Sequence, residues 1–167
     1  YSYTANLDVT SGPDVFTYTL TDGTSTTTTT LTITVGDAND APTAADNTVT
    51  TNEDTDHTFS ESEFGFSDVD GDSLDHVSIE TLPSNGTLLL DGVAVTLGQD
   101  IPAADISNLV FRPAADANGA SYDTFTFSVN DGTTDSASTY TMTIDVTAVN
   151  DAPTAADNTV TTNEDTD

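Results

Sequence analysis

Apolar and polar residues alternate along much of this chain, and the alternation predicts β-strands. The clearest cases are residues 125–129, where Phe, Phe and Val alternate with Thr and Ser, and residues 140–146, where Tyr, Met, Ile and Val alternate with Thr and Asp. Successive side chains of a strand point to opposite faces of the sheet, so each segment has one buried and one exposed face. No stretch has a sustained period of 3.6 residues, so long helices are not expected.

Turn signals separate the predicted strands. Val77 and Ile79 indicate a further strand, and "LLLDGVAV" (Leu88–Val95) predicts a hairpin that turns at its Asp-Gly pair. Pro102–Ser107 predicts one helical turn, and Asn-Gly at Asn85 predicts a turn rather than a glycosylation site. About seven short strands in about 110 residues are typical of an all-β, immunoglobulin-like β-sandwich.

An exact internal repeat organises the chain. The eighteen letters "NDAPTAADNTVTTNEDTD" at Asn39–Asp56 return at Asn150–Asp167. The segment Asp14–Thr24 is similar to Asp123–Thr133. Long internal periods predict tandem arrays. We therefore expect 1–38 to be the C-terminal strands of a preceding repeat, 39–150 a complete repeat, and 151–167 the N-terminal strand of a following repeat.

The threonine run Thr26–Thr30 allows two interpretations. A flat array of threonines can order water, as on an ice-binding face. The alternative is an ordinary strand with threonine on its outward face, because Leu31, Ile33 and Val35 continue an inward alternation. We expect the ordinary strand.

Charge narrows the possible partners. The chain carries 29 acidic residues and a single basic one, for a formal net charge of −28. Nucleic acid is excluded because phosphate binding requires Lys and Arg, and anionic membranes are disfavoured for the same reason. Cysteine is absent, which excludes disulfides and thiolate metal sites. The acids are mostly aspartates, whose short carboxylates suit turns and hard cations.

The acids are clustered in the sequence. They lie in the linkers that open each repeat, in the loop Ser67–Asp75, in the segment Asn52–Asp56 and at Asp131, which follows a predicted strand. Carboxylates that meet at one pole repel one another unless a cation holds them, and Ca²⁺ takes six to eight oxygen ligands. An EF-hand loop is not expected, because Ser73 and Ile79 stand where its glycine and glutamate belong.

Several of these motifs resemble those of one family. "DANDAP" (Asp37–Pro42) is similar to the cadherin linker signature, and "DVDGD" (Asp68–Asp72) is similar to the cadherin Asp-x-Asp-x-Gly loop. "VTTNED" (Val49–Asp54) resembles the first-strand segment whose glutamate reaches Ca²⁺, and Asp131 sits like the late-strand aspartate of the family. The chain thus resembles the cadherin family, in particular the cadherin-like tandem repeats of giant bacterial adhesins of RTX or VCBS type.

The resemblance implies Ca²⁺ ions at the joints between domains, held by nine residues of this chain. The first joint would use Asp37, Asn39, Asp40, Asp68, Asp70 and Asp131, and the second would use Glu53, Asn150 and Asp151. The acidic Asp-Arg-Glu segment of the family has no clear match near Arg112, and Asp116 or Asp123 are its possible substitutes.

The expected function is a calcium-rigidified structural extender of a long extracellular adhesin, surface-layer or filament protein. Its partners would be neighbouring repeats of the same chain and possibly identical chains in a filament. The alternative is a secreted module that binds sugar or ice, although most aromatic residues here alternate inward. An enzyme is not expected, because the two histidines, His57 and His76, stand in acidic loops without a nucleophile pattern.

Overall fold

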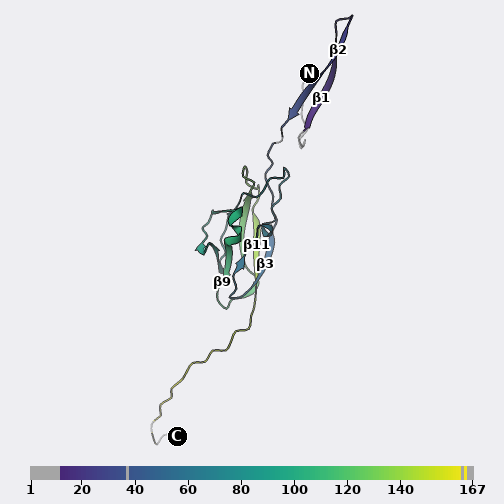
Figure 1. Ribbon diagram of the computed structural model, residues 1–167. Helices are drawn as coiled ribbons and strands as arrows, with labels where there is room; N and C mark the ends of the chain where they lie inside the picture. The colour runs from purple at the N-terminus through teal and green to yellow at the C-terminus, as the bar shows by residue number, and fades with distance from the viewer. Residues whose placement is uncertain (1–11, 37, 163, 165–167) are drawn as a thin grey trace.

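The computed structural model describes residues 12–36, 38–162 and 164, and its centre is a β-sandwich (Figure 1). One sheet has five strands in the order β3-β11-β10-β5-β8, and the other has four in the order β4-β9-β6-β7. The strands of the first sheet are β3 (Asn47–Asn52), β5 (His76–Ile79), β8 (Asp100–Pro102), β10 (Gly119–Asn130) and β11 (Tyr140–Thr147). Those of the second sheet are β4 (His57–Thr58), β6 (Gly86–Leu90), β7 (Val93–Ala94) and β9 (Leu109–Pro113). The all-β sandwich predicted from the sequence is confirmed.

The core lies between the two sheets and is rich in phenylalanine. Phe125 and Phe127 of β10 are fully buried, and each packs against a phenylalanine of the segment that follows β4. The Phe59 ring packs edge-on against Phe125 at 5.7 Å between centroids, and Phe64 packs edge-on against Phe127 at 5.0 Å. Edge-to-face contacts of this kind add to the free energy gained from burying apolar area. The inward faces predicted for 125–129 and 140–146 are confirmed, with Tyr140 half-buried at the end of its strand.

The connections follow the turn chemistry of the sequence. Asp91 and Gly92 join β6 to β7 with φ of +50° and +79°, the left-handed conformation that a two-residue hairpin turn requires. The expected helical turn is a 3₁₀ helix, η2 (Ala103–Asn108), and a second one, η1 (Glu61–Phe64), follows β4. Within the described residues the sandwich has nine strands where about seven were expected, because β4, β7 and β8 span only two or three residues each.

The first and last strands of the sandwich are neighbours and run in the same direction. β3 pairs parallel to β11, with Met142 opposite Asn47 and Thr147 opposite Asn52, whereas every other strand pair in the described residues is antiparallel. The chain therefore enters the sandwich at one pole and leaves it at the opposite pole. We call these the N-terminal pole and the C-terminal pole.

A separate hairpin precedes the sandwich. β1 (Gly12–Thr21) and β2 (Thr26–Val35) form a two-stranded antiparallel sheet that extends beyond the N-terminal pole in Figure 1. Its register places Phe16, Tyr18 and Leu20 on one face with Leu31, Ile33, Thr27 and Thr29, and it places Val15 and the other threonines of the two strands on the opposite face. The run Thr26–Thr30 thus lies in an ordinary strand, as expected.

The inward burial expected for this hairpin is not found. Leu31 is exposed and Ile33 only half-buried, because no second sheet covers them among the described residues. The side chain of Val35 lies outside the described part of the chain. The boundaries 1–38, 39–150 and 151–167 stay a prediction.

Candidate functional site

The linker is hydrogen-bonded to acidic residues at the N-terminal pole. Asn39 Nδ2 donates to Asp131 Oδ2 at 2.9 Å, and the backbone N–H of Asp40 donates to Asp70 Oδ2 at 2.7 Å. These residues are separated by 30 or more positions in the sequence. The sandwich brings them together because the loop before β5 and the end of β10 lie at the pole where the chain arrives.

The loop Ser67–Asp72 is folded around one carboxylate. Asp68 Oδ1 accepts the backbone N–H groups of Asp70 at 2.8 Å and Asp72 at 3.1 Å. Its second oxygen, Oδ2, is buried and has no hydrogen-bond partner in the described structure. One carboxylate oxygen from each of Asp68, Asp70 and Asp72 lies within 4.8 Å of the others. A buried carboxylate oxygen without a donor is costly unless a cation or a donor reaches it.

Asp131 is held at the same pole by the turn that follows β10. Its Oδ1 accepts the backbone N–H groups of Thr133 and Thr134, both at 2.7 Å. The hydrogen bond from Asn39, followed by those from the Thr134 and Thr133 N–H groups, lowers the pKa of Asp131 below its ordinary value, against the opposing effect of burial. Asp131 is therefore a fixed anion that faces the linker.

The C-terminal pole is built on a buried glutamate. Glu53 follows β3, and its Oε1 accepts the backbone N–H of Val149 at 2.6 Å, while its Oε2 accepts Asn118 Nδ2 at 2.8 Å. These two bonds, the one from Asn118 first, lower the pKa of Glu53 although burial opposes them. Glu53 thus fixes the departing chain to the sandwich.

Three exposed aspartates, one of them in the departing chain, lie together at the C-terminal pole. Asp54, Asp116 and Asp151 each place a carboxylate oxygen within 4.8 Å of the other two, and the Asp116 N–H donates to Asp54 Oδ1 at 3.2 Å. The pKa of Asp151 is raised by desolvation first, then by the negative charges of Asp116, Glu53 and Asp54. The pole therefore carries electrostatic repulsion that a bound cation would relieve.

The structure brings most of the expected ligands to the two poles. Asn39, Asp40, Asp68, Asp70 and Asp131 meet at the N-terminal pole, and Glu53 and Asp151 meet at the C-terminal pole. Asp37 lies outside the described residues. Asn150 is exposed and donates to the Asp151 carbonyl at 3.1 Å, as Asn39 does to the Asp40 carbonyl at 3.1 Å. Metal binding by these residues stays a prediction.

Sequence reasoning left Asp54, Asp72 and Asp116 out of the ligand set. Asp116 was one of two possible substitutes for the acidic segment near Arg112, and the structure places it at the C-terminal pole. It occupies a left-handed backbone conformation with φ of +55°, which Asp tolerates better than most residues. The "DANG" turn around it is a signal that could have marked it.

The other possible substitute, Asp123, stabilises a loop of the sandwich. It is buried in β10, and its carboxylate accepts the N–H groups of Ser84 at 2.9 Å, Asn85 at 2.7 Å and Gly86 at 2.8 Å. This contact fixes the loop before β6, and it confirms Asn85 as a turn residue. Among the described residues, the hydrogen bonds of the Asp123 carboxylate go to this loop and to the N–H of Thr124.

One acid of the Asn52–Asp56 segment is neutralised within the chain. Arg112, the only basic side chain in the sequence, donates Nε and Nη2 to the carboxylate of Asp56 at 2.9 and 2.7 Å. The Arg112 hydrogen bonds lower the pKa of Asp56. Asp56 is thereby removed from the acids that a cation would hold.

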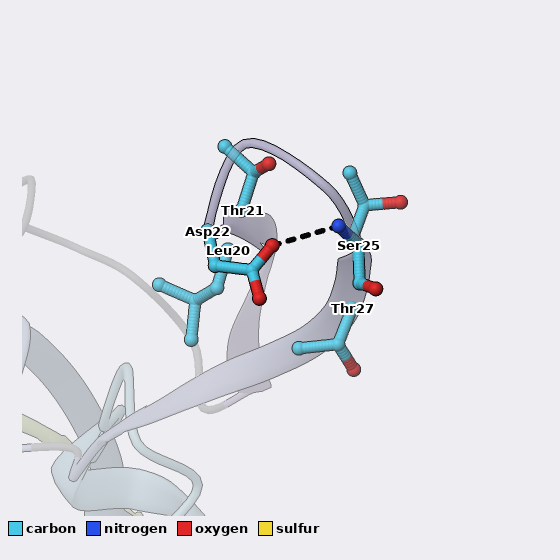
Figure 2. Close-up of a pocket in the computed structure, with 6 residues that line it drawn as sticks. Leu20, Thr21, Asp22, Ser25 and Thr27 are labelled. Carbon is cyan, nitrogen blue, oxygen red and sulfur yellow. Dashed lines mark hydrogen bonds between the residues drawn. The ribbon is translucent and has the colours of Figure 1, made fainter.

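A shallow hollow lies at the turn of the β1–β2 hairpin (Figure 2). Asp22 borders it, and its Oδ1 accepts the N–H groups of Thr24 at 2.8 Å and Ser25 at 2.7 Å. These bonds, the one from Ser25 first, lower the pKa of Asp22. The Asp22 carboxylate accepts N–H groups two and three residues further along the chain, as the Asp131 carboxylate does. The same turn therefore follows β1 and β10, and the hollow lies on the exposed side of the first one.

Comparisons with known proteins agree with the fold. A family model described as "Bacterial Ig domain" matches residues 39–147. Among solved structures, the chain is similar to an endo-fucoidan hydrolase, MfFcnA4_H294Q, from glycoside hydrolase family 107, with 19% identity and a TM-score of 0.38. That match covers 83% of this chain but 19% of the hydrolase, too distant a likeness to support an argument. A search of curated proteins gives no match. In the described part of the chain, no helix has the length and apolar character needed to cross a membrane.

Proposed function

Because this chain belongs to the bacterial Ig domain family, we propose that it is a structural extender repeat of a long extracellular adhesin, surface-layer or filament protein, rigidified by Ca²⁺ at the joints between domains. Bacterial Ig domains usually occur in extracellular or surface proteins, which supports this location. The cadherin-like motifs of the linker and of the Asp68–Asp72 loop support the calcium-dependent part. The proposed role is mechanical and includes no catalytic step.

One observation carries the proposal: acids gather where the chain enters the sandwich and where it leaves. Asn39 of the first linker copy is hydrogen-bonded to Asp131 at the N-terminal pole. Asp151 of the second copy lies beside Asp54 and Asp116 at the C-terminal pole. In a tandem array the C-terminal pole of one repeat faces the N-terminal pole of the next, so the two acidic sets would meet around one linker.

The residues present fit a calcium ion. The sites offer oxygen atoms and no thiolate, and hard oxygen ligands are what Ca²⁺ takes in proteins. The buried Oδ2 of Asp68 has no donor in the described structure, so a cation would satisfy it. At the N-terminal pole the holding residues would be Asn39, Asp40, Asp68, Asp70, Asp72 and Asp131. At the C-terminal pole they would be Glu53, Asp54, Asp116 and Asp151. The ion would supply positive charge that offsets their mutual repulsion.

Calcium is expected to act on the joint more than on the sandwich. The buried alternation of β10 and β11 stabilises the sandwich without ions, at about 25 cal/mol per Å² of apolar area. The linker residues 150–153 are exposed and have no such core. An array without calcium would therefore bend between rigid domains, and an array with calcium would be rod-like.

Thermal melting with and without calcium tests the binding. At a hundredfold excess of Ca²⁺ over its dissociation constant, each site adds about 2.7 kcal/mol to the free energy of unfolding. We expect the melting temperature to rise from chelator to millimolar Ca²⁺, and Mg²⁺ to substitute poorly because it requires a smaller octahedral site. An unchanged melting temperature would contradict the proposal.

A matched pair of variants locates the site. Asp68→Asn removes the charge of the carboxylate around which the N-terminal loop is folded, and we expect it to reduce the calcium-dependent rise. Asp91→Asn removes one charge from the exposed β6–β7 turn, where Asn-Gly is equally favourable, and the rise should be retained. Small-angle scattering from two tandem repeats should show a longer, narrower distribution of dimensions with calcium than with chelator.

A further inference from the structure

The sequence contains two Asn-Gly pairs, and the structure holds them differently. They are Asn85-Gly86, at the start of β6, and Asn118-Gly119, at the start of β10. In such a pair the backbone nitrogen of the glycine can attack the side-chain amide carbon of the asparagine, because glycine has no side chain to obstruct the approach. The attack closes a five-membered succinimide ring, so it requires the asparagine side chain and the following peptide unit to rotate toward each other.

The first pair cannot make this rotation. The backbone N–H groups of Asn85 and Gly86 both donate to Asp123 Oδ2, at 2.7 and 2.8 Å, and Asn85 Nδ2 donates to the Tyr122 carbonyl at 2.9 Å. Gly86 also packs so closely under Phe111 that a Cβ at this position would lie 2.3 Å from its ring. The attacking nitrogen and the amide that it would attack are therefore both held in place.

The second pair has room to move. Asn118 is exposed and lies just before β10, and a Cβ at Gly119 would meet no atom within 4 Å. Gly119 is opposite Val146, but the register shifts between Gly119 and Asp123, so this first pair of the ladder stands apart from the rest. Isolated pairs at the end of a strand open more readily than those within it.

We propose that Asn118 is a deamidation site, and that its conversion weakens the contact that fixes the departing chain to the sandwich. The Gly119 nitrogen forms a bond to Cγ of Asn118, and the side-chain NH₂ leaves as ammonia with the proton of the Gly119 N–H. Water then opens the ring at one of its two carbonyls and leaves an aspartate or an isoaspartate. Water is the one co-reactant, and nothing is oxidised or reduced.

The consequence falls on Glu53. Asn118 Nδ2 donates to Glu53 Oε2 at 2.8 Å, and this bond contributes more to the lowered pKa of Glu53 than the bond from Val149 does. After deamidation, position 118 carries a second carboxylate where a donor stood. Two ionised carboxylates at hydrogen-bond distance repel each other. Because Glu53 Oε1 accepts the Val149 N–H, a displaced Glu53 releases the chain at the C-terminal pole.

A second consequence rests on the proposed function. The new carboxylate would join Glu53, whose charge already acts on Asp151, and the aspartates Asp54 and Asp116. A bound Ca²⁺ would take it as an additional oxygen ligand and offset the repulsion. Deamidation would thus turn a contact that holds without calcium into one that depends on calcium.

Deamidation rates test the site, with Asn85 as the control within the same chain. The folded protein is incubated in mildly alkaline buffer with chelator, digested with pepsin and analysed by mass spectrometry, where each conversion adds about 1 Da. We expect Asn118 to convert at least about tenfold faster than Asn85. In urea the two rates should be similar, because glycine follows both residues. Equal rates in the folded protein would overturn the proposal, as would an Asn118 that converts only in urea.

Variants test the effect on the departing chain. Asn118→Ala removes the donor, whereas Asn118→Asp removes it and adds the charge that deamidation creates. In chelator, Asn118→Asp should lower the melting temperature and the hydrogen-exchange protection of the Val149 N–H more than Asn118→Ala does. Asn108→Asp, which adds one charge at the exposed end of η2, should leave that protection unchanged. Equal effects of the two Asn118 variants would overturn the repulsion between positions 118 and 53.

Repeating these measurements in millimolar Ca²⁺ separates the two proposals. The additional loss caused by Asn118→Asp should shrink when calcium is present. A loss that persists in calcium contradicts calcium binding at the C-terminal pole, whereas the deamidation site is decided by the rates in chelator.

Discussion

One piece of this sequence occurs twice and another has a similar counterpart, in each case once inside the sandwich and once outside it. "NTVTTN" is the paired strand β3 in one place and exposed chain in the other, and the β10–β11 unit has its counterpart in the β1–β2 hairpin. The hairpin copies share one register, but Phe127 is fully buried while its counterpart Tyr18 is 46% exposed. Local sequence thus determines which strands pair, whereas burial depends on the residues that cover them.

The largest expected difference is between aromatic residues at matching positions. Phe127→Ala removes a fully buried ring that packs edge-on against Phe64, and we expect it to lower the free energy of unfolding by about 3–5 kcal/mol. Tyr18→Ala, on the open hairpin, should change it by less than about 0.5 kcal/mol. Urea unfolding followed by far-UV circular dichroism measures both. Similar losses in the two variants would show that the hairpin is part of the folding unit.

The identical strand sequences give a smaller but sharper contrast. Val49→Ala removes two methyl groups from a buried side chain of β3 and should cost about 2 kcal/mol, because the transfer and cavity terms add. Val160→Ala makes the same change in the same local sequence at an exposed position. We expect no measurable loss, because the side chain has little packing to lose. Equal losses would mean that residues 158–162 pair within one molecule.

The smallest expected effect concerns acid sensitivity. The hydrogen bonds from Asn118 and Val149 lower the pKa of Glu53, so its ionised form stabilises the fold above the ordinary glutamate pKa of about 4.3. That contribution is lost as the pH falls through the lowered pKa. Glu53→Gln should therefore flatten the decline of the unfolding free energy below about pH 4.3. Glu164→Gln, in the exposed copy of the segment, should leave the decline unchanged.

The fold could be predicted because its signals are local. Period-two alternation marked β10 and β11, and Asp91-Gly92 marked a turn that requires left-handed backbone at both residues. The same signal exists in the second strand of the hairpin, where the alternation of Leu31, Ile33 and Val35 predicted the strand. Alternation predicts which face of a strand is apolar, but it does not predict whether another sheet covers that face. Leu31 is exposed because no sheet among the described residues covers it.

The site was predicted less completely because its geometry is long-range. Asn39 and Asp131 are 92 positions apart, and their expected proximity came from a family resemblance rather than from spacing. Asp116 and Asp123 were equivalent in the sequence, yet one lies among the acids of the C-terminal pole and the other is buried beneath a turn. Only the packing of the loop before β6 against β10 distinguishes them.

The parallel pairing of β3 with β11 determines how the domain responds to tension. The chain enters at the start of β3 and leaves at the end of β11, and six consecutive residue pairs join these two strands. A pull along the chain drags the strands in opposite senses along their length, so the ladder is loaded in shear and its hydrogen bonds share the force. Strands joined by a tight turn would instead be peeled apart one bond at a time. The topology therefore suits a repeat that must hold its length under tension, as the proposed extender role requires.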